Sequence, residues 1–149
     1  MGFDEDLDKA LVNAKAETGK LLAEQRKLTA DEATALVAKV SDCRVTQVVD
    51  IKKGVHCMVS KDAQKSLAEP RPTAETSEHL VTYAANADLN KAMDAASWSM
   101  IELLQKERSL SRLDAYSLAS MTMDCRVGEM EAAEKGVHCL VPKGLWVKR

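Results

Sequence analysis

The segment Asp42-Cys43-Arg44-Val45 recurs later in the chain as Asp124-Cys125-Arg126-Val127. The segment Lys53-Gly54-Val55-His56-Cys57 recurs in the same way as Lys135-Gly136-Val137-His138-Cys139. Both recurrences have an offset of 82 positions (124 − 42 and 135 − 53). At this offset residues 2–61 align with residues 84–143 without a gap, and 22 of the 60 aligned positions are identical. Such self-similarity predicts two copies of one structural unit.

Each copy has the pattern of helix, helix, strand, turn and strand. In the first copy, apolar residues at helical spacing predict a long helix through residues 7–22. Thr29 with Glu32, and Ser111 with Asp114 in the second copy, have the spacing of a capping box that starts a short second helix. Residues 44–50 and 55–59 predict a hairpin across a turn that contains Gly54. The predicted fold class is therefore α+β, with two homologous helix-helix-β-hairpin units.

The boundaries of the copies follow from the same alignment. Residues 1–62 form the first unit and residues 78–149 the second, and residues 63–77, which contain Pro70 and Pro72, are expected to be a linker. Residues 79–83 predict a strand that leads into the second copy. The first copy has only three residues in the equivalent place, so we expect it to lack this leading strand. Units of about 60 residues are marginal alone, which favours pseudo-twofold packing around one shared core.

Composition argues against several classes of partner. The net charge of −2 and the pI near 5.9 give no broad attraction to nucleic acid or to an anionic membrane. Aromatic residues make up only 3% of the chain, so stacking of single-stranded bases is disfavoured. No apolar run reaches the ~18 residues of a membrane span, and the acidic start does not resemble a signal peptide. We therefore expect a cytoplasmic protein whose four cysteines are reduced rather than joined in disulfides.

The repeated segments resemble part of a known enzyme family. Residues 29–61 and 110–143, with their Asp-Cys-Arg-Val and Gly-Val-His-Cys motifs, look like the C-terminal region of acetamidase/formamidase amidohydrolases, present here as two tandem copies. The resemblance implies descent from enzymes that hydrolyse the carbon–nitrogen bond of small linear amides. The family's metal-binding and catalytic part lies upstream of this region, in a segment rich in Gly-Asp-Gly-Glu, and nothing in the chain is similar to it. The resemblance therefore assigns no catalytic residue here.

The repeated Asp-x-Arg motif gives the first candidate site. Asp42 and Arg44 are two positions apart on a predicted strand, so they share a face and can form an ion pair, as can Asp124 and Arg126. Such a pair is most often a structural salt bridge. The alternative is a binding site in which arginine holds a small polar ligand or a subunit partner, because its guanidinium matches a carboxylate.

Cysteine and histidine give a second candidate group. Each repeat carries two cysteines and one histidine, which are weak candidates for a zinc site: Cys43, His56 and Cys57, and Cys125, His138 and Cys139. Neighbours such as His56 and Cys57 should point to opposite faces of a strand, which argues against a shared metal. We expect buried structural thiols, ahead of a metal site and of redox or nucleophilic chemistry. No cofactor is predicted for this chain; zinc or another divalent metal is expected only with the missing family part.

Two functions remain open at this stage. One is an amidase-like fragment or subunit that acts on a small amide only when the missing part is supplied, with stand-alone activity not expected. The other is a non-catalytic α+β module for assembly or partner binding. Self-association or a partner subunit is expected in either case.

Overall fold

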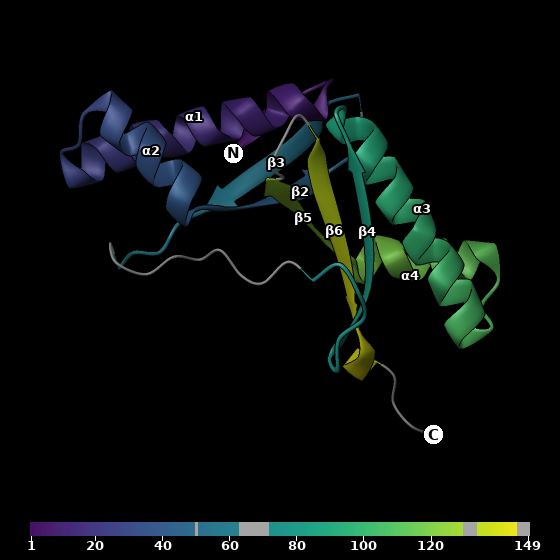
Figure 1. Ribbon diagram of the computed structural model, residues 1–149. Helices are drawn as coiled ribbons and strands as arrows, with labels where there is room; N and C mark the ends of the chain where they lie inside the picture. Colours follow the sequence, from purple (N-terminus) through teal and green to yellow (C-terminus); the bar gives the residue numbers. More distant parts are fainter. Residues whose placement is uncertain (50, 63–71, 130–133, 146–149) are drawn as a thin grey trace. The chain divides into compact units, whose positions relative to one another are not determined.

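The computed structural model describes residues 1–49, 51–62, 72–129 and 134–145 (Figure 1). The chain divides into two compact units, unit 1 (Met1–Pro70) and unit 2 (Arg71–Arg149). Each unit combines helices with an antiparallel sheet, which confirms the predicted α+β class. Among the described residues, no helix has the length and apolar character that crossing a membrane requires.

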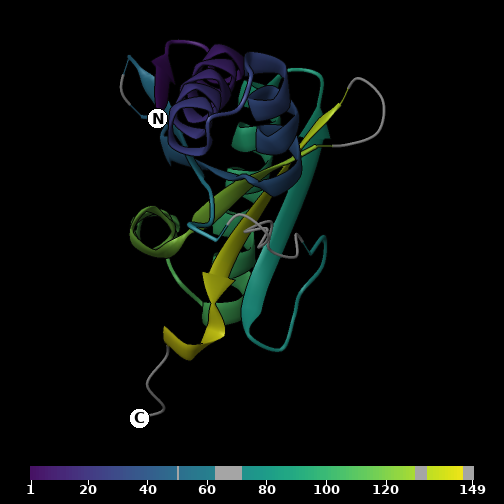
Figure 2. The same ribbon diagram turned by 90° about the vertical axis from the view of Figure 1, so that its left-hand side faces the viewer.

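Unit 1 contains two helices and three strands in the order β1 (Gly2–Asp4), α1 (Leu7–Arg26), α2 (Ala30–Val40), β2 (Asp42–Gln47) and β3 (Lys53–Met58). Strand β3 is central and pairs antiparallel with both β1 and β2. The two helices lie side by side (Figure 2). The predicted capping box of α2 is confirmed, since Glu32 accepts a hydrogen bond from the backbone N–H of Thr29 at 2.9 Å. This bond lowers the pKa of the Glu32 carboxyl below its ordinary value.

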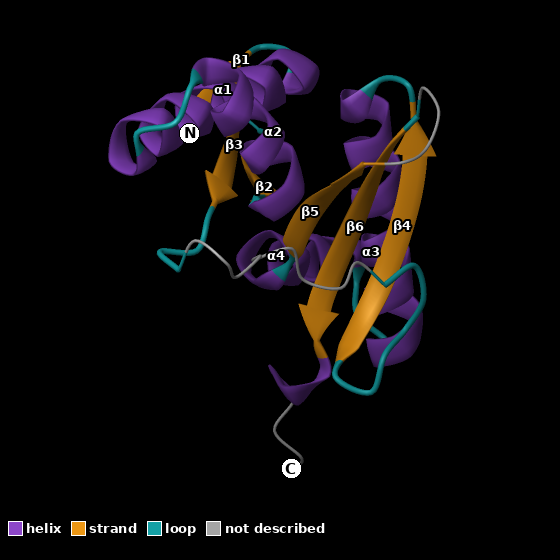
Figure 3. Ribbon diagram, turned by 60° about the vertical axis from the view of Figure 1, so that its left-hand side comes forward, coloured by secondary structure: helices purple, strands orange, loops and turns teal. Residues whose placement is uncertain are grey.

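Unit 2 repeats the same order with β4 (His79–Asn86), α3 (Leu89–Arg108), α4 (Arg112–Thr122), β5 (Asp124–Glu129) and β6 (Lys135–Pro142), followed by a short 3-10 turn, η1 (Lys143–Leu145). Strand β6 is central, between β4 and β5 (Figure 3). The Ser111 side chain caps α4 by accepting a hydrogen bond from the backbone N–H of Asp114. Helix α3 contacts β4 and β6.

The prediction that unit 1 lacks its leading strand is wrong. Strand β1 is only three residues long, but its register matches that of β4: Gly2 pairs with Val55, and Ala84, 82 positions later, pairs with Val137. Gly2 makes this possible, because a Cβ atom there would lie 2.2 Å from the Ala10 carbonyl oxygen of α1. A three-residue stretch gives too little alternation for a sequence-based prediction of a strand.

The predicted linker is described only in part. Residues 63–71 lie outside the described residues, as does Asp50 at the end of the predicted strand 44–50. Residues 72–77 contact unit 2. The Lys143 ammonium of η1 forms an ion pair with Glu75, and the backbone N–H of Thr76 donates to the His79 carbonyl at 3.0 Å. This part of the predicted linker, residues 72–77, therefore belongs to unit 2.

The alternation of each hairpin separates its side chains into two sets. Gly2 faces α1, and its cross-strand partner Val55 is fully buried on the same side. Cys43 and Cys57 are paired directly opposite each other and share this helix-facing side. In unit 2 the hydroxyl of Thr82 donates to the Ala96 carbonyl of α3, which places its strand partner Cys139 on the helix-facing side. Asp42, Arg44 and His56, and their counterparts, point to the other side.

Candidate functional site

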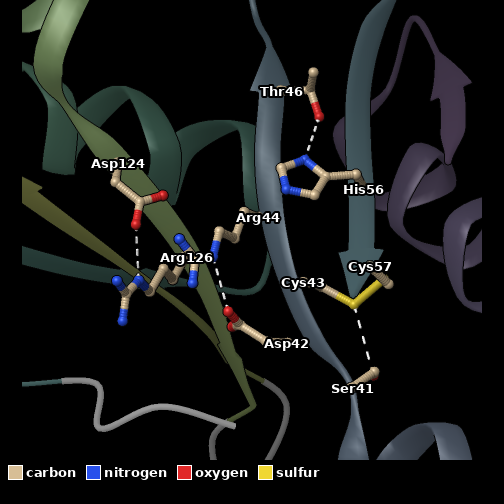
Figure 4. Close-up of polar contacts among 9 residues, drawn as sticks. All are labelled: Ser41, Asp42, Cys43, Arg44, Thr46, His56, Cys57, Asp124 and Arg126. Atoms are coloured by element: carbon tan, nitrogen blue, oxygen red, sulfur yellow. Dashed lines mark hydrogen bonds and ion pairs between the residues drawn. A yellow bond between two sulfur atoms is a disulfide. The ribbon is translucent and has the colours of Figure 1, made fainter. Parts of the chain in front are cut away.

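The ion pair predicted from the Asp-x-Arg motif is present in both units (Figure 4). The Arg44 Nε donates to the Asp42 carboxylate at 2.8 Å, and the Arg126 Nε donates to Asp124 at 2.9 Å. Both pairs lie at the junction where the short helix ends and the strand begins. The Asp42 side chain is only 1% exposed and that of Arg44 is 20% exposed. A carboxylate as deeply buried as that of Asp42 needs its cation for the fold itself, which favours a structural role for this pair. In the second pair Asp124 is more exposed, at 34%, and Arg126 is 11% exposed.

The two repeated histidines have different surroundings. The His56 Nδ1 hydrogen-bonds the Thr46 hydroxyl across the hairpin at 2.7 Å (Figure 4). His138 is buried, its Nδ1 lies 3.1 Å from the Pro72 carbonyl, and its ring lies 4.8 Å from that of Tyr83. The residue aligned with Thr46 in the second copy is Gly128, which has no hydroxyl group to bond the ring of His138. Each ring is therefore held by contacts within its own unit.

The prediction of reduced thiols is wrong. All four cysteines form disulfides, Cys43 with Cys57 and Cys125 with Cys139. The Cα atoms of these pairs are 4.1 Å and 4.2 Å apart, as suits the closer type of directly opposed pair in an antiparallel ladder. The prediction of reduced thiols was based on the expected cytoplasmic location, which carries no information about the register of the strands. The bonded sulfurs are not thiolates, the form that metal coordination and nucleophilic attack require.

These contacts define what the sequence-predicted residues do in the structure. Each ion pair joins neighbours on one strand, and each disulfide joins two strands of one hairpin. His56 and Cys57 point to opposite sides, as the alternation predicts. In the part of the chain that the structure describes, no three side chains of the His, Cys, Asp and Glu types gather in a way that could hold a metal ion. The structure thus joins the candidates in pairs within one strand or one hairpin.

A different feature offers space for a ligand. A groove of about 480 Å³ lies between α1 and α2, entirely within unit 1. Its walls are small and apolar apart from two lysines and a threonine: Val12, Lys15, Ala16, Gly19, Lys20 and Ala23 from α1, and Ala30, Thr34, Val37 and Ala38 from α2. The floor is built by Val37, which packs with Leu22 and Ala33 in the small core between the helices. Most of the other wall residues are exposed, so the groove opens to solvent.

Unit 2 has larger side chains at the equivalent positions, 82 residues later. Ala16, Gly19, Ala30 and Thr34 correspond to Trp98, Ile101, Arg112 and Tyr116. The Arg112 guanidinium lies over the Trp98 ring, 4.9 Å from its centroid, and so bridges α3 and α4. Trp98 and Tyr116 remain 46% and 43% exposed. The helix pair that forms a groove in unit 1 thus carries partly exposed aromatic side chains in unit 2.

Lysine gives the groove its charge. Lys15 and Lys20 are the charged residues of its lining, and Lys20 donates to the Glu17 carboxylate at 2.6 Å. This hydrogen bond, followed by the attraction between the two charges, raises the pKa of the Lys20 ammonium above its ordinary value. It lowers the pKa of Glu17 for the same reasons. Lys20 therefore remains a cation throughout the neutral range.

The groove was not predicted from the sequence, although the sequence contains one signal for it. The small residues Ala16, Gly19 and Ala23 lie along one side of α1. The residues aligned with them in the second copy are larger: Trp98, Ile101 and Gln105. Comparison of the two copies position by position would have located it.

A comparison of the chain with protein-family models, curated proteins and solved structures finds no match. The relationship to acetamidases and formamidases accordingly stays a prediction.

Proposed function

We propose that this chain is a non-catalytic α+β module that binds a partner in the groove between α1 and α2. The observation that carries this proposal is the contrast between the two copies. One helix pair is hollow and lined with small apolar residues, and the equivalent pair is filled by Trp98, Ile101, Arg112 and Tyr116. An open apolar groove with a few polar groups at its rim is the usual form of a binding site.

The state of the candidate chemical groups supports the same proposal. Nucleophilic catalysis by cysteine requires a thiolate within reach of a base, and the four cysteines are joined in disulfides. The Asp42–Arg44 and Asp124–Arg126 pairs connect the end of a helix to a strand. These residues serve the architecture of each unit, which leaves the groove as the best-supported site.

The proposal extends to the arrangement of the two units. Their identical element order and register support an origin by duplication. We propose that they pack about a pseudo-twofold axis around one shared aliphatic core, because each is small for independent stability.

An apolar fluorescent probe tests the binding site. Anilinonaphthalene sulfonate carries an aromatic body and one negative charge, so it matches apolar walls flanked by lysine. We expect its fluorescence to rise on addition of the native protein, and to rise much less with Ala16→Trp, which fills the groove as Trp98 fills unit 2. Glu24→Trp, on an exposed part of α1 outside the groove lining, is the matched control and should behave as the native protein does. Equal fluorescence with both variants would refute the proposed site.

The amidase relationship is a second proposal, which rests on the resemblance of the repeated helix and hairpin segments to the family's C-terminal region. It predicts that this chain hydrolyses a small amide only when joined by the missing catalytic part, with zinc or another divalent metal. Ammonia release from formamide and acetamide is the assay, with and without added zinc. Turnover by the purified chain above that of a boiled control would overturn the non-catalytic proposal.

A further inference from the structure

We infer that the occupant of the groove is a second copy of this chain, which inserts the aromatic ridge of its unit 2. The ridge is defined as the exposed parts of Trp98 and Tyr116, on α3 and α4. This inference rests on the proposed function, because it names the partner of the same groove.

Shape is the first argument. The ridge and the groove stand on homologous helix pairs and differ by the exchange of small residues for large ones at aligned positions. In unit 2 the partly exposed Trp98 ring on α3 lies against the Arg112 side chain of α4. The groove of unit 1 offers about 480 Å³ between the corresponding helices. An aromatic side chain provides a large apolar area for such a contact, about 150–250 Å² when fully buried.

Charge is the second argument. Asp94 and Glu102 lie four residues before and four residues after Trp98, on the same face of α3, and both are exposed. The groove is flanked by Lys15 and Lys20 on α1. Arg112 over Trp98 and Glu17 beside Lys20 each offset one of these charges, which leaves the ridge with a net charge of −1 (two acidic, one basic) and the groove with +1 (two basic, one acidic). This opposite sign guides encounter and orientation more than it adds affinity. This match favours the second copy over an arbitrary apolar partner.

The contact joins two different surfaces, so it is head-to-tail. Within the described residues each chain has one such groove and one ridge. The groove of a chain that docks its ridge is therefore filled by the same partner or by a further copy. Contacts of this kind build rings when the rotation closes and open chains when it does not. Two copies that each dock the ridge in the other's groove close a dimer, and other arrangements build a larger ring or an open chain.

Two complementary variants test the inference. Sedimentation velocity on the native protein should show an average mass that rises with protein concentration. Trp98→Ala removes the indole ring of the ridge and leaves Tyr116, and Ala16→Trp blocks the groove. Each should weaken association about tenfold or more, as expected for a central aromatic anchor. Because each variant keeps the surface that the other lacks, an equal mixture should form a one-to-one complex that grows no further. Circular dichroism checks that both variants are folded.

Further outcomes separate this inference from the proposed function. Reversal of charge at Lys15 and Lys20 to Glu should weaken association, and combination with a Trp98-bearing variant in which Asp94 and Glu102 are changed to Lys should restore it. A native protein that stays monomeric, or a Trp98→Ala variant that associates as well as the native chain, overturns the inference. If the probe still distinguishes Ala16→Trp from Glu24→Trp, the groove remains a binding site for another partner. If it does not, the proposed function fails as well.

Discussion

Glycine at position 2 determines how closely the first strand of unit 1 approaches its helix. A Cβ atom on Gly2 would lie 2.2 Å from the Ala10 carbonyl oxygen and 2.3 Å from the Ala14 amide nitrogen. Both are backbone atoms of α1, so neither can rotate away as a flexible side chain would. The equivalent strand position in unit 2 is Ala84, which shows that β4 is set to admit a methyl group there.

We therefore expect Gly2→Ala to destabilise the protein by about 1–3 kcal/mol, the usual cost of overpacking. Release of β1 from β3 limits this cost, because the strand has only three residues. Gly144→Ala is the control, since a Cβ atom there has no neighbour within 4 Å. Urea unfolding of both variants measures the effect. A midpoint for Gly2→Ala equal to that of the native protein would show that β1 does not pack against α1 in this way.

At the scale of elements, the hairpins show both the reach and the limit of prediction from sequence. The motifs around Cys43 and His56 predicted two paired strands in each copy, because alternation is a local signal. The prediction that Gly54 lies in the turn is wrong, since Gly54 belongs to β3 and pairs with Phe3 and Gln47. The disulfides depend on register, since Cys43 lies directly opposite Cys57 only in one of the available pairings. The groove depends on two helices meeting, and Ala16 and Thr34 show no relation to each other until α1 and α2 are packed. Secondary structure could therefore be predicted from local sequence patterns, whereas contacts between elements could not.

Removal of one disulfide by the double substitution Cys43→Ala with Cys57→Ala should lower the free energy of unfolding by about 3 kcal/mol, from the entropy of the closed loop. The corresponding double substitution at Cys125 and Cys139 should have a similar effect, because both bridges span a sequence separation of 14. Urea unfolding under non-reducing conditions provides the measurement.

The oxidation state of the native protein is checked separately. Denatured protein treated with iodoacetamide should gain no mass unless a reductant is added first. Alkylation of the cysteines without a reductant would contradict the observed pairing.

At the scale of the whole molecule, the question is whether two repeats behave as one folding unit. The chain divides at Pro70 and Arg71 into units of which each has its own helices and sheet. Domains near this size bury a smaller fraction of the surface of their unfolded chain than larger domains do, and so are marginal alone. The sequence predicted the repetition from its constant offset, but no local pattern specifies how two units pack, because that depends on surfaces brought together only after folding.

If the units share one core, as we propose, they must unfold together. Differential scanning calorimetry should then show a single transition whose calorimetric enthalpy equals its van't Hoff enthalpy. The Gly2→Ala variant, altered only in unit 1, should shift this transition without splitting it. Two resolved transitions, of which only one responds to Gly2→Ala, would demonstrate independent units.

The turn between the long and the short helix has the same backbone conformation in both copies. Helix α1 is followed by Lys27, with φ 53°, and helix α3 by Ser109, with φ 51°, and both residues are in the left-handed region. Neither residue is glycine, although the left-handed conformation is unfavourable for other L-residues. The two repeats have thus kept a corner while changing the residue that forms it. With this corner present in both copies, the hollow of one surface and the ridge of the other accompany a change of side chains at aligned positions, from Ala16 and Thr34 to Trp98 and Tyr116.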